Sequence, residues 1–287
     1  MIERRDRRPS WWLIGILLIV VLFVLLPIYW LVVATTKNDT TLFGNNPFVP
    51  NTVGNVGSNF SALFTTQGGI FGRWLVNSVI YAGVTALLTT YLSAITGVAI
   101  SKFRFHGRRL LIAVIIGSFM VPNTVLIVPL FILEHGLHLT NTYEGVILPL
   151  IVFPFGVYFM SVYSADAVPD TLLEAARVDG ARIVRVVHQI TLPLVVPGMV
   201  TLFLIAFIGV WNNYFLPLVL IGSSRLYPLT VGLEIWLSTI NSPGVGRTLY
   251  LQVITGSFVS ILPMLILFPV LQKYIARGLT LGAVVGE

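Results

Sequence analysis

The 287-residue chain contains no cysteine, which excludes disulfide bonds, thiol nucleophiles and cysteine-ligated metal sites. Charged residues are also scarce, at 10% of the chain, whereas 56% of the residues are hydrophobic. A soluble domain of this length does not need so much apolar surface. The composition therefore predicts a membrane protein.

Six apolar stretches are each long enough to cross a bilayer, which takes about 20 helical residues. None of them contains Asp, Glu, Lys, Arg or His. Because one such charge at a helix centre costs about 2.5–3.5 kcal/mol, their absence indicates true spans. We predict an all-α membrane protein with six transmembrane helices, over residues 11–33, 74–100, 110–133, 145–163, 194–221 and 251–271.

The first stretch follows basic residues, as a signal peptide would. Its apolar run is too long for one, and no small-x-small cleavage site follows Val33. We therefore expect this stretch to be retained as a span.

Lys and Arg are distributed unevenly between the two sides of these spans. With the N-terminus inside, only four of the 17 fall in outer loops: Lys37, Arg73, Arg225 and Arg247. The other 13 are inner residues, namely Arg4, Arg5, Arg7, Arg8, Lys102, Arg104, Arg108, Arg109, Arg177, Arg182, Arg185, Lys273 and Arg277. Basic loops stay in the cytoplasm, so we expect both termini to be cytoplasmic. The net charge of +6 then reflects this bias and anionic headgroups, and we expect no nucleic-acid partner.

The chain also lacks groups that other membrane proteins use for catalysis or ion coupling. It has no Gly-rich phosphate loop of the Walker type, so ATP would have to act through a partner. The serines in the spans have no His, Lys or Asp partner there, and no ionisable residue lies at mid-membrane. An ion-coupled secondary carrier, an intramembrane enzyme, and a receptor or scaffold without transport remain minor alternatives.

Four histidines, His106, His135, His138 and His188, are predicted to lie in loops. His135 and His138 are three residues apart, but only Glu134 could add a third ligand nearby. We therefore expect no metal site.

Prolines interrupt the predicted spans, and we consider eight of them as candidate bends. Each removes a backbone donor and bends its helix, and helices that line a path or rock against one another can use such bends. Proline is also simply more frequent in membrane helices, which is the alternative explanation. The eight are Pro27, Pro122, Pro129, Pro149, Pro154, Pro217, Pro263 and Pro269.

The sequence of the longest inner loop, residues 164–193, predicts two short helices. Pro169 suits the first position of the first helix, and Asp170 lies in its first turn, where the helix dipole favours an anion. Gly180 is predicted to end this helix with a positive φ. Its apolar face is predicted to hold Leu172, Leu173 and Ala176.

The second helix of this loop is predicted over Ala181 to Gln189 and is closed by Pro193. Its apolar face is expected to carry Ile183, Val184, Val187 and Ile190.

Glu174, Ala175 and Ala176 form the feature of this loop that points to a partner. Two small side chains would let another surface approach the helix backbone closely, and Glu174 adds one directed charge. The alternative is an ordinary amphipathic connector that lies on the membrane.

The order Glu174-Ala175-Ala176, Gly180, Ile190 and Leu192-Pro193 resembles the EAA loop of ATP-binding-cassette importer permeases at every motif position. Other stretches resemble the carbohydrate-uptake, maltose G-type subfamily, and the resemblance covers residues from about 70 to the end. These stretches are Asn77-Ser78, Phe103 to Arg109, Trp211-Asn212-Asn213, and Arg277 to Val284. The tail departs from the pattern at Val285, where a lysine is usual, which puts any tail contact of that lysine in doubt.

This resemblance implies a type I importer permease fold, with residues 1–70 as an N-terminal span and first outer loop and residues 71–287 as the permease domain. The cytoplasmic loop 164–193 would insert into a cleft of an ATPase subunit. The coupling residues would be Glu174, Ala175, Ala176, Asp179, Gly180, Leu192 and Pro193.

The resemblance also implies partners. These are a second homologous permease in a heterodimer, a cytoplasmic ATPase dimer that binds ATP and Mg²⁺, an extracytoplasmic solute-binding protein and membrane lipid. No cofactor is expected in this chain, which would be a transport subunit of a bacterial or archaeal cytoplasmic membrane and not an enzyme.

A sugar is the solute that the subfamily implies, and a non-sugar solute such as glycerol phosphate is the alternative. Aromatic rings stack on sugars and amides bond hydroxyl groups, although Asn also packs helices together and Trp and Tyr favour the membrane interface. The candidate path residues are Asn77, Asn123, Trp211, Asn212, Asn213 and Tyr214.

Overall fold

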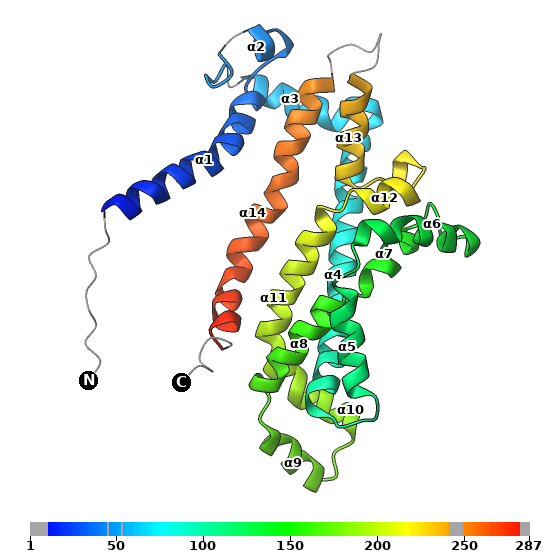
Figure 1. Ribbon diagram of the computed structural model, residues 1–287. Coiled ribbons are helices and arrows are strands. Elements are labelled where there is room, and N and C mark those ends of the chain that lie inside the picture. The colour runs from blue at the N-terminus through cyan, green and yellow to red at the C-terminus, as the bar shows by residue number, and fades with distance from the viewer. Residues whose placement is uncertain (1–10, 45, 53, 241–248, 282–287) are drawn as a thin grey trace. The chain divides into compact units, whose positions relative to one another are not determined.

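The structure is a computed structural model that describes residues 11–44, 46–52, 54–240 and 249–281, except the side chains of 270, 271 and 273–281. The arginines before residue 11, Arg247, the side chains of Lys273 and Arg277, and the tail beyond Leu281 with Val285 lie outside this description. Every regular element among the described residues is helical, which confirms the all-α prediction (Figure 1).

Four helical segments are long and apolar enough to cross a membrane by length and composition. They are α1 (Trp11–Thr35), α4 (Ile70–Lys102), the segment Ile183–Trp211, and Tyr250–Pro269 within α14 (Tyr250–Leu281). Two further spans are bent helix pairs. Counting each bent pair as one span gives six, as the hydropathy predicts.

The first bent pair joins α5 (Arg108–Ser118) to the 3₁₀ turn η2 (Asn123–Leu126) and α6 (Ile127–Gly136), at 95°. The second joins α7 (Tyr143–Ile151) to α8 (Pro154–Ala167), at 42°. Both breaks coincide with a predicted bending residue, Pro122 or Pro154. Proline lacks an N–H and pushes the preceding residue out of the α region, so the helix stops there. Four other prolines, Pro27, Pro149, Pro263 and Pro269, lie inside continuous helices.

Helices extend past the apolar stretches at several points, because backbone hydrogen bonds do not require apolar side chains. Arg73 lies in the first turn of α4, and Glu134 and His135 lie in the last turn of α6. His135 was predicted in a loop, so that assignment is wrong.

The described chain forms two compact units, each treated by itself. One unit comprises residues up to Gly69 together with Leu233–Ile261, and the other comprises Ile70–Gly232 and the chain from Leu262. Leu233–Ile261 thus groups with the N-terminal part, and the predicted division into residues 1–70 and 71–287 stays a prediction.

The N-terminal unit is held together by buried polar contacts. Besides α1 it contains α2 (Asp39–Gly44), α3 (Gly54–Thr65) and the turn η1 (Thr66–Gly68). The Asn59 amide donates to the carbonyls of Thr35 and Lys37 at 2.8 Å, and the Lys37 ammonium donates to the carbonyl of Asn46 at 2.7 Å. Buried polar groups that are satisfied in this way fix the chain that follows α1.

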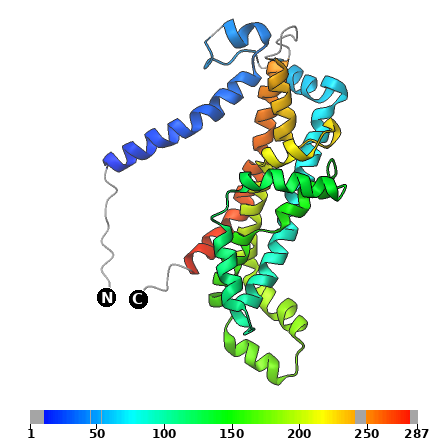
Figure 2. The ribbon, with the colours of Figure 1, turned by 45° about the vertical axis from the view of Figure 1, so that its right-hand side comes forward.

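The second unit is built around α4, which packs against α8 and against α11 (Leu192–Trp211), as Figures 1 and 2 both show. Small residues allow the close approach of helices that membrane packing favours. A Cβ added to Gly97 of α4 would lie 2.6 Å from the Cβ of Met160 in α8. Around this contact lies a core of buried side chains that includes Ala94, Val98, Val195 and Leu202.

The N-terminal half of α4 holds an irregular segment that follows α12 (Phe215–Leu220) and includes the turn η4 (Ser224–Leu226). The Trp74 indole donates to the carbonyl of Ser224 at 2.8 Å, and the Tyr81 hydroxyl donates to that of Leu226 at 3.0 Å. The chain then enters α13 (Leu229–Ile240). Backbone carbonyls of an irregular segment are thus satisfied by side chains of one helix.

Candidate functional site

The first helix of the inner loop 164–193 is α9 (Asp170–Val178), which lies beyond the ends of α8 and α11 in both views (Figures 1 and 2). Leu173 and Ala176 are buried at 8% and 6% exposure, in the core shared with α4, α8 and α11. Leu172, predicted on the same face, is 43% exposed. That prediction is wrong, because only a narrow stripe with three-residue spacing contacts the bundle.

The end of α9 is closed by a Schellman motif around Gly180. Gly180 has φ +69°, and its N–H donates to the carbonyl of Arg177 at 3.1 Å. The next N–H, from Ala181, donates to the carbonyl of Ala176 at 2.9 Å. These are the two bonds that define the motif, and they satisfy carbonyls that a helix end leaves free. The predicted positive φ at Gly180 is confirmed.

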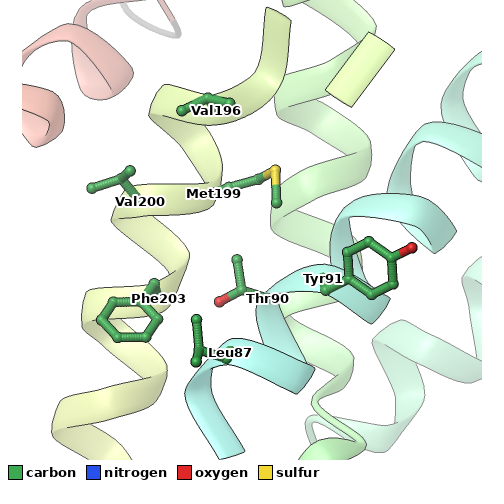
Figure 3. A pocket seen from close by; sticks show the side chains of 7 residues that line it. All are labelled: Leu87, Thr90, Tyr91, Val196, Met199, Val200 and Phe203. Carbon is green, nitrogen blue, oxygen red and sulfur yellow. The ribbon is translucent and has the colours of Figure 1, made fainter. Parts of the chain in front are cut away.

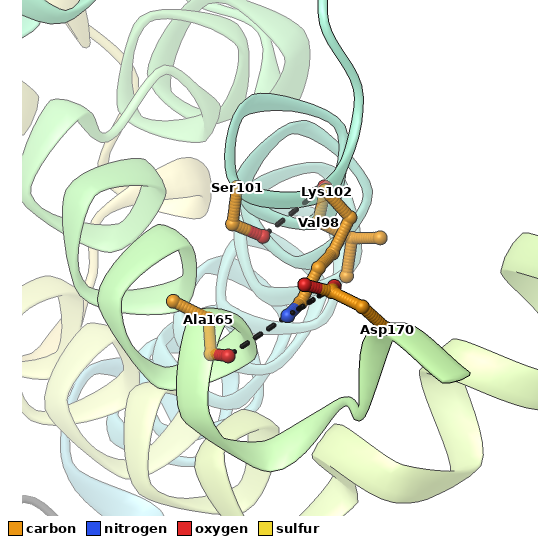
Figure 4. Close-up of polar contacts among 5 residues, drawn as sticks. All are labelled: Val98, Ser101, Lys102, Ala165 and Asp170. Carbon is orange, nitrogen blue, oxygen red and sulfur yellow. Dashed lines mark hydrogen bonds and ion pairs between the residues drawn. The ribbon is translucent and has the colours of Figure 1, made fainter. Parts of the chain in front are cut away.

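The start of α9 is held from a distant helix. The Lys102 ammonium donates to Asp170 Oδ1 at 2.9 Å and to the carbonyl of Ala165 at 2.8 Å (Figure 4). Asp170 lies in the first turn, as predicted, whereas Pro169 precedes the helix as its N-cap residue. The sequence marked Lys102 only as one of the inner basic residues, because its partners lie more than 60 positions away.

The solvent-facing surface of α9 carries Glu174, Ala175, Val178 and Asp179, all exposed. Val178, an apolar side chain, is 88% exposed. The one ion pair within the described part of the chain joins Lys102 to Asp170, so Glu174 has no cationic partner there.

Ala176 does not share this surface. The sequence placed Ala176 on the apolar face, which is confirmed, but it also counted Ala175 and Ala176 together as small residues that a partner approaches, and Ala176 is buried within the chain's own core. Its small size therefore allows α9 to lie close to the bundle, and Ala175 alone offers a small side chain outward.

The second part of the loop is continuous with the following span. It consists of α10 (Ile183–Arg185), the π-helical segment η3 (Val186–Thr191) and α11. Pro193 was predicted to close this helix, yet it lies near the N-terminus of α11 and the helix runs on to Trp211. The wider π-turn comes directly before Pro193, where a proline ring would clash with a carbonyl of a regular α-helix.

The π-turn also changes which side chains face the bundle. Ile183 and Val184, predicted on the buried face, are 63% and 67% exposed. Val187, also predicted on that face, is buried at 8%, and Ile190 is partly buried against the core, so the prediction holds for these two. Val186, which was not predicted there, is buried at 6%. One extra residue per turn rotates the helix face, so a prediction based on a period of 3.6 misplaces it. Leu192 is partly buried against the core, whereas Pro193 is exposed.

His188 lies in the π-helical segment and not in a loop, contrary to the prediction. Its Nε2 is 2.8 Å from the Tyr91 hydroxyl of α4, and its Nδ1 is 3.0 Å from the carbonyl of Val184. A neutral ring with a proton on Nδ1 satisfies both contacts, donating to Val184 and accepting from Tyr91. The described residues contain no group of three metal-ligating side chains.

Two of the residues predicted to line the solute path make contacts within the fold. Asn77 is 1% exposed, and its amide donates to the carbonyls of Arg225 and Tyr227 at 2.9 and 3.0 Å. Its Oδ1 accepts the Tyr143 hydroxyl at 2.6 Å. Trp211 is 6% exposed and stacks on Phe207. Both side chains are buried and packed within the fold in this conformation, and their place in a solute path stays a prediction.

The other candidates lie at breaks in the helices. Asn123 is exposed at the 95° bend, and Asn212 is exposed where α11 ends. Asn213 and Tyr214 are half-buried between α11 and α12. The predicted fifth span is therefore interrupted after Trp211. In a membrane protein, irregular backbone is tolerated where it is buried in protein or lines a water-filled cavity.

An open apolar pocket of ≈ 370 Å³ lies between α4 and α11 (Figure 3). Thr90 and Tyr91 are the two lining residues that carry a hydroxyl group, and the Tyr91 hydroxyl lies 2.8 Å from His188 Nε2. Such a surface suits an acyl chain or an apolar side chain and does not provide the several hydrogen-bonding groups that a sugar requires. Its lining residues are Leu87, Thr90, Tyr91, Val196, Met199, Val200 and Phe203.

Known proteins similar in sequence show the family to which the chain belongs. Residues 90–281 match the family model described as binding-protein-dependent transport system inner membrane component. The arabinooligosaccharides transport system permease protein AraQ of Bacillus subtilis is 34% identical over 92% of each chain. The sn-glycerol-3-phosphate transport system permease protein UgpE of Yersinia pestis is 30% identical over 92% of this chain and 93% of the relative.

A solved structure shares the fold. It is that of a bacterial ABC transporter involved in the import of the acidic polysaccharide alginate, with a TM-score of 0.80 and 24% identity. The match covers 96% of this chain and 99% of that one. The bundle around α4 and the loop that carries α9 thus belong to a known permease fold. The chain is a member of the family of binding-protein-dependent transport system inner membrane components.

Proposed function

We propose that this chain is a membrane-spanning subunit of an ATP-driven importer and that α9 is the element through which an ATPase moves it. The observation that carries the proposal is the double character of α9. Glu174, Ala175 and Val178 face outward, while Leu173 and Ala176 are packed into the core of the bundle.

Such a helix is suited to transmit force. A partner bound to the outer surface of α9 would move the buried residues Leu173 and Ala176, and with them the helices against which they pack. Protein interiors are close-packed and transmit displacement with little loss. The Schellman motif at Gly180 fixes the end of α9, so that the helix moves as a rigid element.

The proposed topology places both termini and α9 in the cytoplasm, on the basis of the Lys and Arg distribution. Arg177, Arg182 and Arg185 all lie in the inner loop 164–193 and support this orientation. An amphipathic connector lying on the membrane is less well supported, because the exposed surface of α9 carries Glu174 and Asp179 beside Val178.

The proposed complex contains a second, homologous permease, a cytoplasmic ATPase dimer that binds ATP and Mg²⁺, and an extracytoplasmic solute-binding protein. This chain would bind no cofactor and catalyse no reaction itself. It would span the cytoplasmic membrane of a bacterium or archaeon several times, with residues 71–287 as the permease domain.

The proposed solute is a sugar. The similarity to AraQ, at 34% identity, supports this class, and the similarity to UgpE, at 30%, keeps glycerol phosphate as the second candidate. The groups that would meet a solute are those at the helix breaks, Asn123, Asn212, Asn213 and Tyr214, since their amides and ring suit hydroxyl groups.

The test is reconstitution of the complete complex in proteoliposomes with its own ATPase and binding protein. We expect ATP-dependent uptake, with ATP hydrolysis stimulated by an arabino-oligosaccharide or another saccharide. If glycerol phosphate stimulates ATP hydrolysis and no sugar does, the solute is glycerol phosphate and the sugar proposal is wrong. Uptake that persists without ATP, at a constant ion gradient, would overturn the importer assignment in favour of a carrier.

A further inference from the structure

We propose that Lys102 is a positioning residue that couples α9 to α4, so that movement of α9 reaches both α4 and α8. This inference rests on the proposed role of α9 and adds a specific path for its movement.

The geometry places one cation at the junction of three helices. Lys102 is the last residue of α4, and its side chain is only 7% exposed. Its ammonium contacts the carbonyl of Ala165 in the last turn of α8 and Oδ1 of Asp170 in the first turn of α9 (Figure 4). The end of α8 and the start of α9 are thus held to the same atom, Nζ of Lys102.

The charges suit the positions that they occupy. The carbonyls at the C-terminal end of a helix carry partial negative charge, which the ammonium complements at Ala165. Asp170 complements the N-terminal end of α9 and attracts the same cation. Val168 and Pro169 alone connect α8 to α9 in the chain, so Lys102 spans this connection from outside.

The contact with Asp170 is not a major source of stability. The Asp170 side chain is 76% exposed, and ion pairs with an exposed partner contribute little because water screens them. The packing of Leu173 and Ala176 would keep α9 folded against the bundle without Lys102. Loss of Lys102 should therefore weaken transmission to α4 while leaving assembly intact.

Lys102→Met tests this idea, since methionine keeps an unbranched apolar stem and removes the ammonium. In the reconstituted complex we expect normal amounts of bound ATPase and normal thermal stability, but a several-fold fall in solute moved per ATP hydrolysed. Lys102→Arg, which keeps a cation and several donors, should restore the ratio. Arg104→Met, which removes an exposed inner charge two residues away, is the matched control and should leave it unchanged.

A second variant separates the ion pair from the lysine itself. Asp170→Ala should lower the same ratio, and the double variant with Lys102→Met should be no worse than Lys102→Met alone, because Lys102→Met already removes the ion pair that Asp170→Ala removes. Additive losses would show that Asp170 acts on its own and would overturn the proposed link.

The outcomes distinguish this inference from the function on which it rests. If the wild-type complex shows no ATP-dependent uptake, the proposed function fails. If the wild type and Arg104→Met transport normally and Lys102→Met keeps the wild-type ratio, the coupling role of Lys102 is refuted and the importer assignment stands. A loss that Lys102→Arg does not rescue would also contradict a role that depends on the cation.

Discussion

The backbone N–H of Ala181 donates to the carbonyl of Ala176 at 2.9 Å, across the left-handed turn at Gly180. Ala176 is buried against the bundle, so this bond fixes the end of α9 to the part of the helix that touches the core. It also directs the chain back toward α10. The packing of Leu173 and Ala176 leaves Glu174 and Ala175 on the exposed side of the helix, and this closure fixes where the helix ends.

Gly180→Val should damage the coupling loop through the backbone alone. No atom lies within 4 Å of a Cβ added at Gly180, so there is no steric obstacle to the side chain itself. The left-handed conformation costs an L-residue about 1–2 kcal/mol, and a β-branched residue is the least tolerant. We expect weaker retention of the ATPase and slower uptake, measured in the reconstituted complex. Gly180→Asn should be much milder, since asparagine tolerates this conformation; equal damage from both would contradict the backbone explanation.

Glu174→Lys should impair binding of the ATPase without unfolding the permease. Glu174 is exposed and belongs to no ion pair within the described chain, so its replacement breaks no internal contact of that kind. The measurement is the amount of ATPase that copurifies with the permease, together with uptake. Glu144→Lys, a reversal at an exposed acidic residue in the first turn of α7, is the control. Wild-type recruitment and uptake by Glu174→Lys would exclude Glu174 from the coupling surface.

Asn77→Ala should reduce stability and not solute affinity. It would leave two carbonyls and the Tyr143 hydroxyl without their buried partner, which costs roughly 1–3 kcal/mol for each unsatisfied group. Thermal unfolding in detergent measures the loss. Asn212→Ala provides the contrast, because Asn212 is exposed and bonds only to the carbonyl of Ile208 in its own helix. It should change the KM for uptake while leaving the melting temperature close to that of the wild type. A KM change confined to Asn77→Ala would restore Asn77 to the solute path.

Gly97→Ala should separate α4 from α8. The added Cβ would lie 2.6 Å from Met160 Cβ and 2.7 Å from backbone atoms of α8, and the backbone cannot move aside cheaply. Overpacking of this kind typically costs about 1–3 kcal/mol. Gly83→Ala, in the same helix, has no atom within 4 Å of the new Cβ and should be neutral or slightly stabilising. Equal melting temperatures for the two variants would show that α4 and α8 are not packed this closely.

The sequence predicted the spans well because a span depends on the composition of its own stretch and not on contacts with residues distant in the sequence. It also predicted the left-handed turn at Gly180, since a glycine after an amphipathic segment has a local cause. Both breaks at Pro122 and Pro154 likewise follow from the chemistry of one residue.

The errors arose where distant residues decide the structure. The internal hydrogen bonds of Asn77 could not be foreseen, because the carbonyls of Arg225 and Tyr227 lie about 150 positions away. Ala176 was placed on the apolar face and also counted among the small residues that a partner approaches, because a short helix pattern does not reveal which small residue contacts the bundle. The π-turn before Pro193 could not be foreseen from periodicity, since one shifted hydrogen-bond register moves every later side chain.

Photo-crosslinking from Ala175 tests the central claim most directly. The chain has no cysteine, so Ala175→Cys can be labelled at a single site with a maleimide-linked benzophenone. Ser58→Cys in α3, exposed and predicted on the opposite side of the membrane, serves as the control. In a transport-active complex we expect irradiation to yield a permease–ATPase adduct from position 175 and none from position 58. An active complex that gives no ATPase adduct from position 175 would contradict the assignment of α9 as the coupling element.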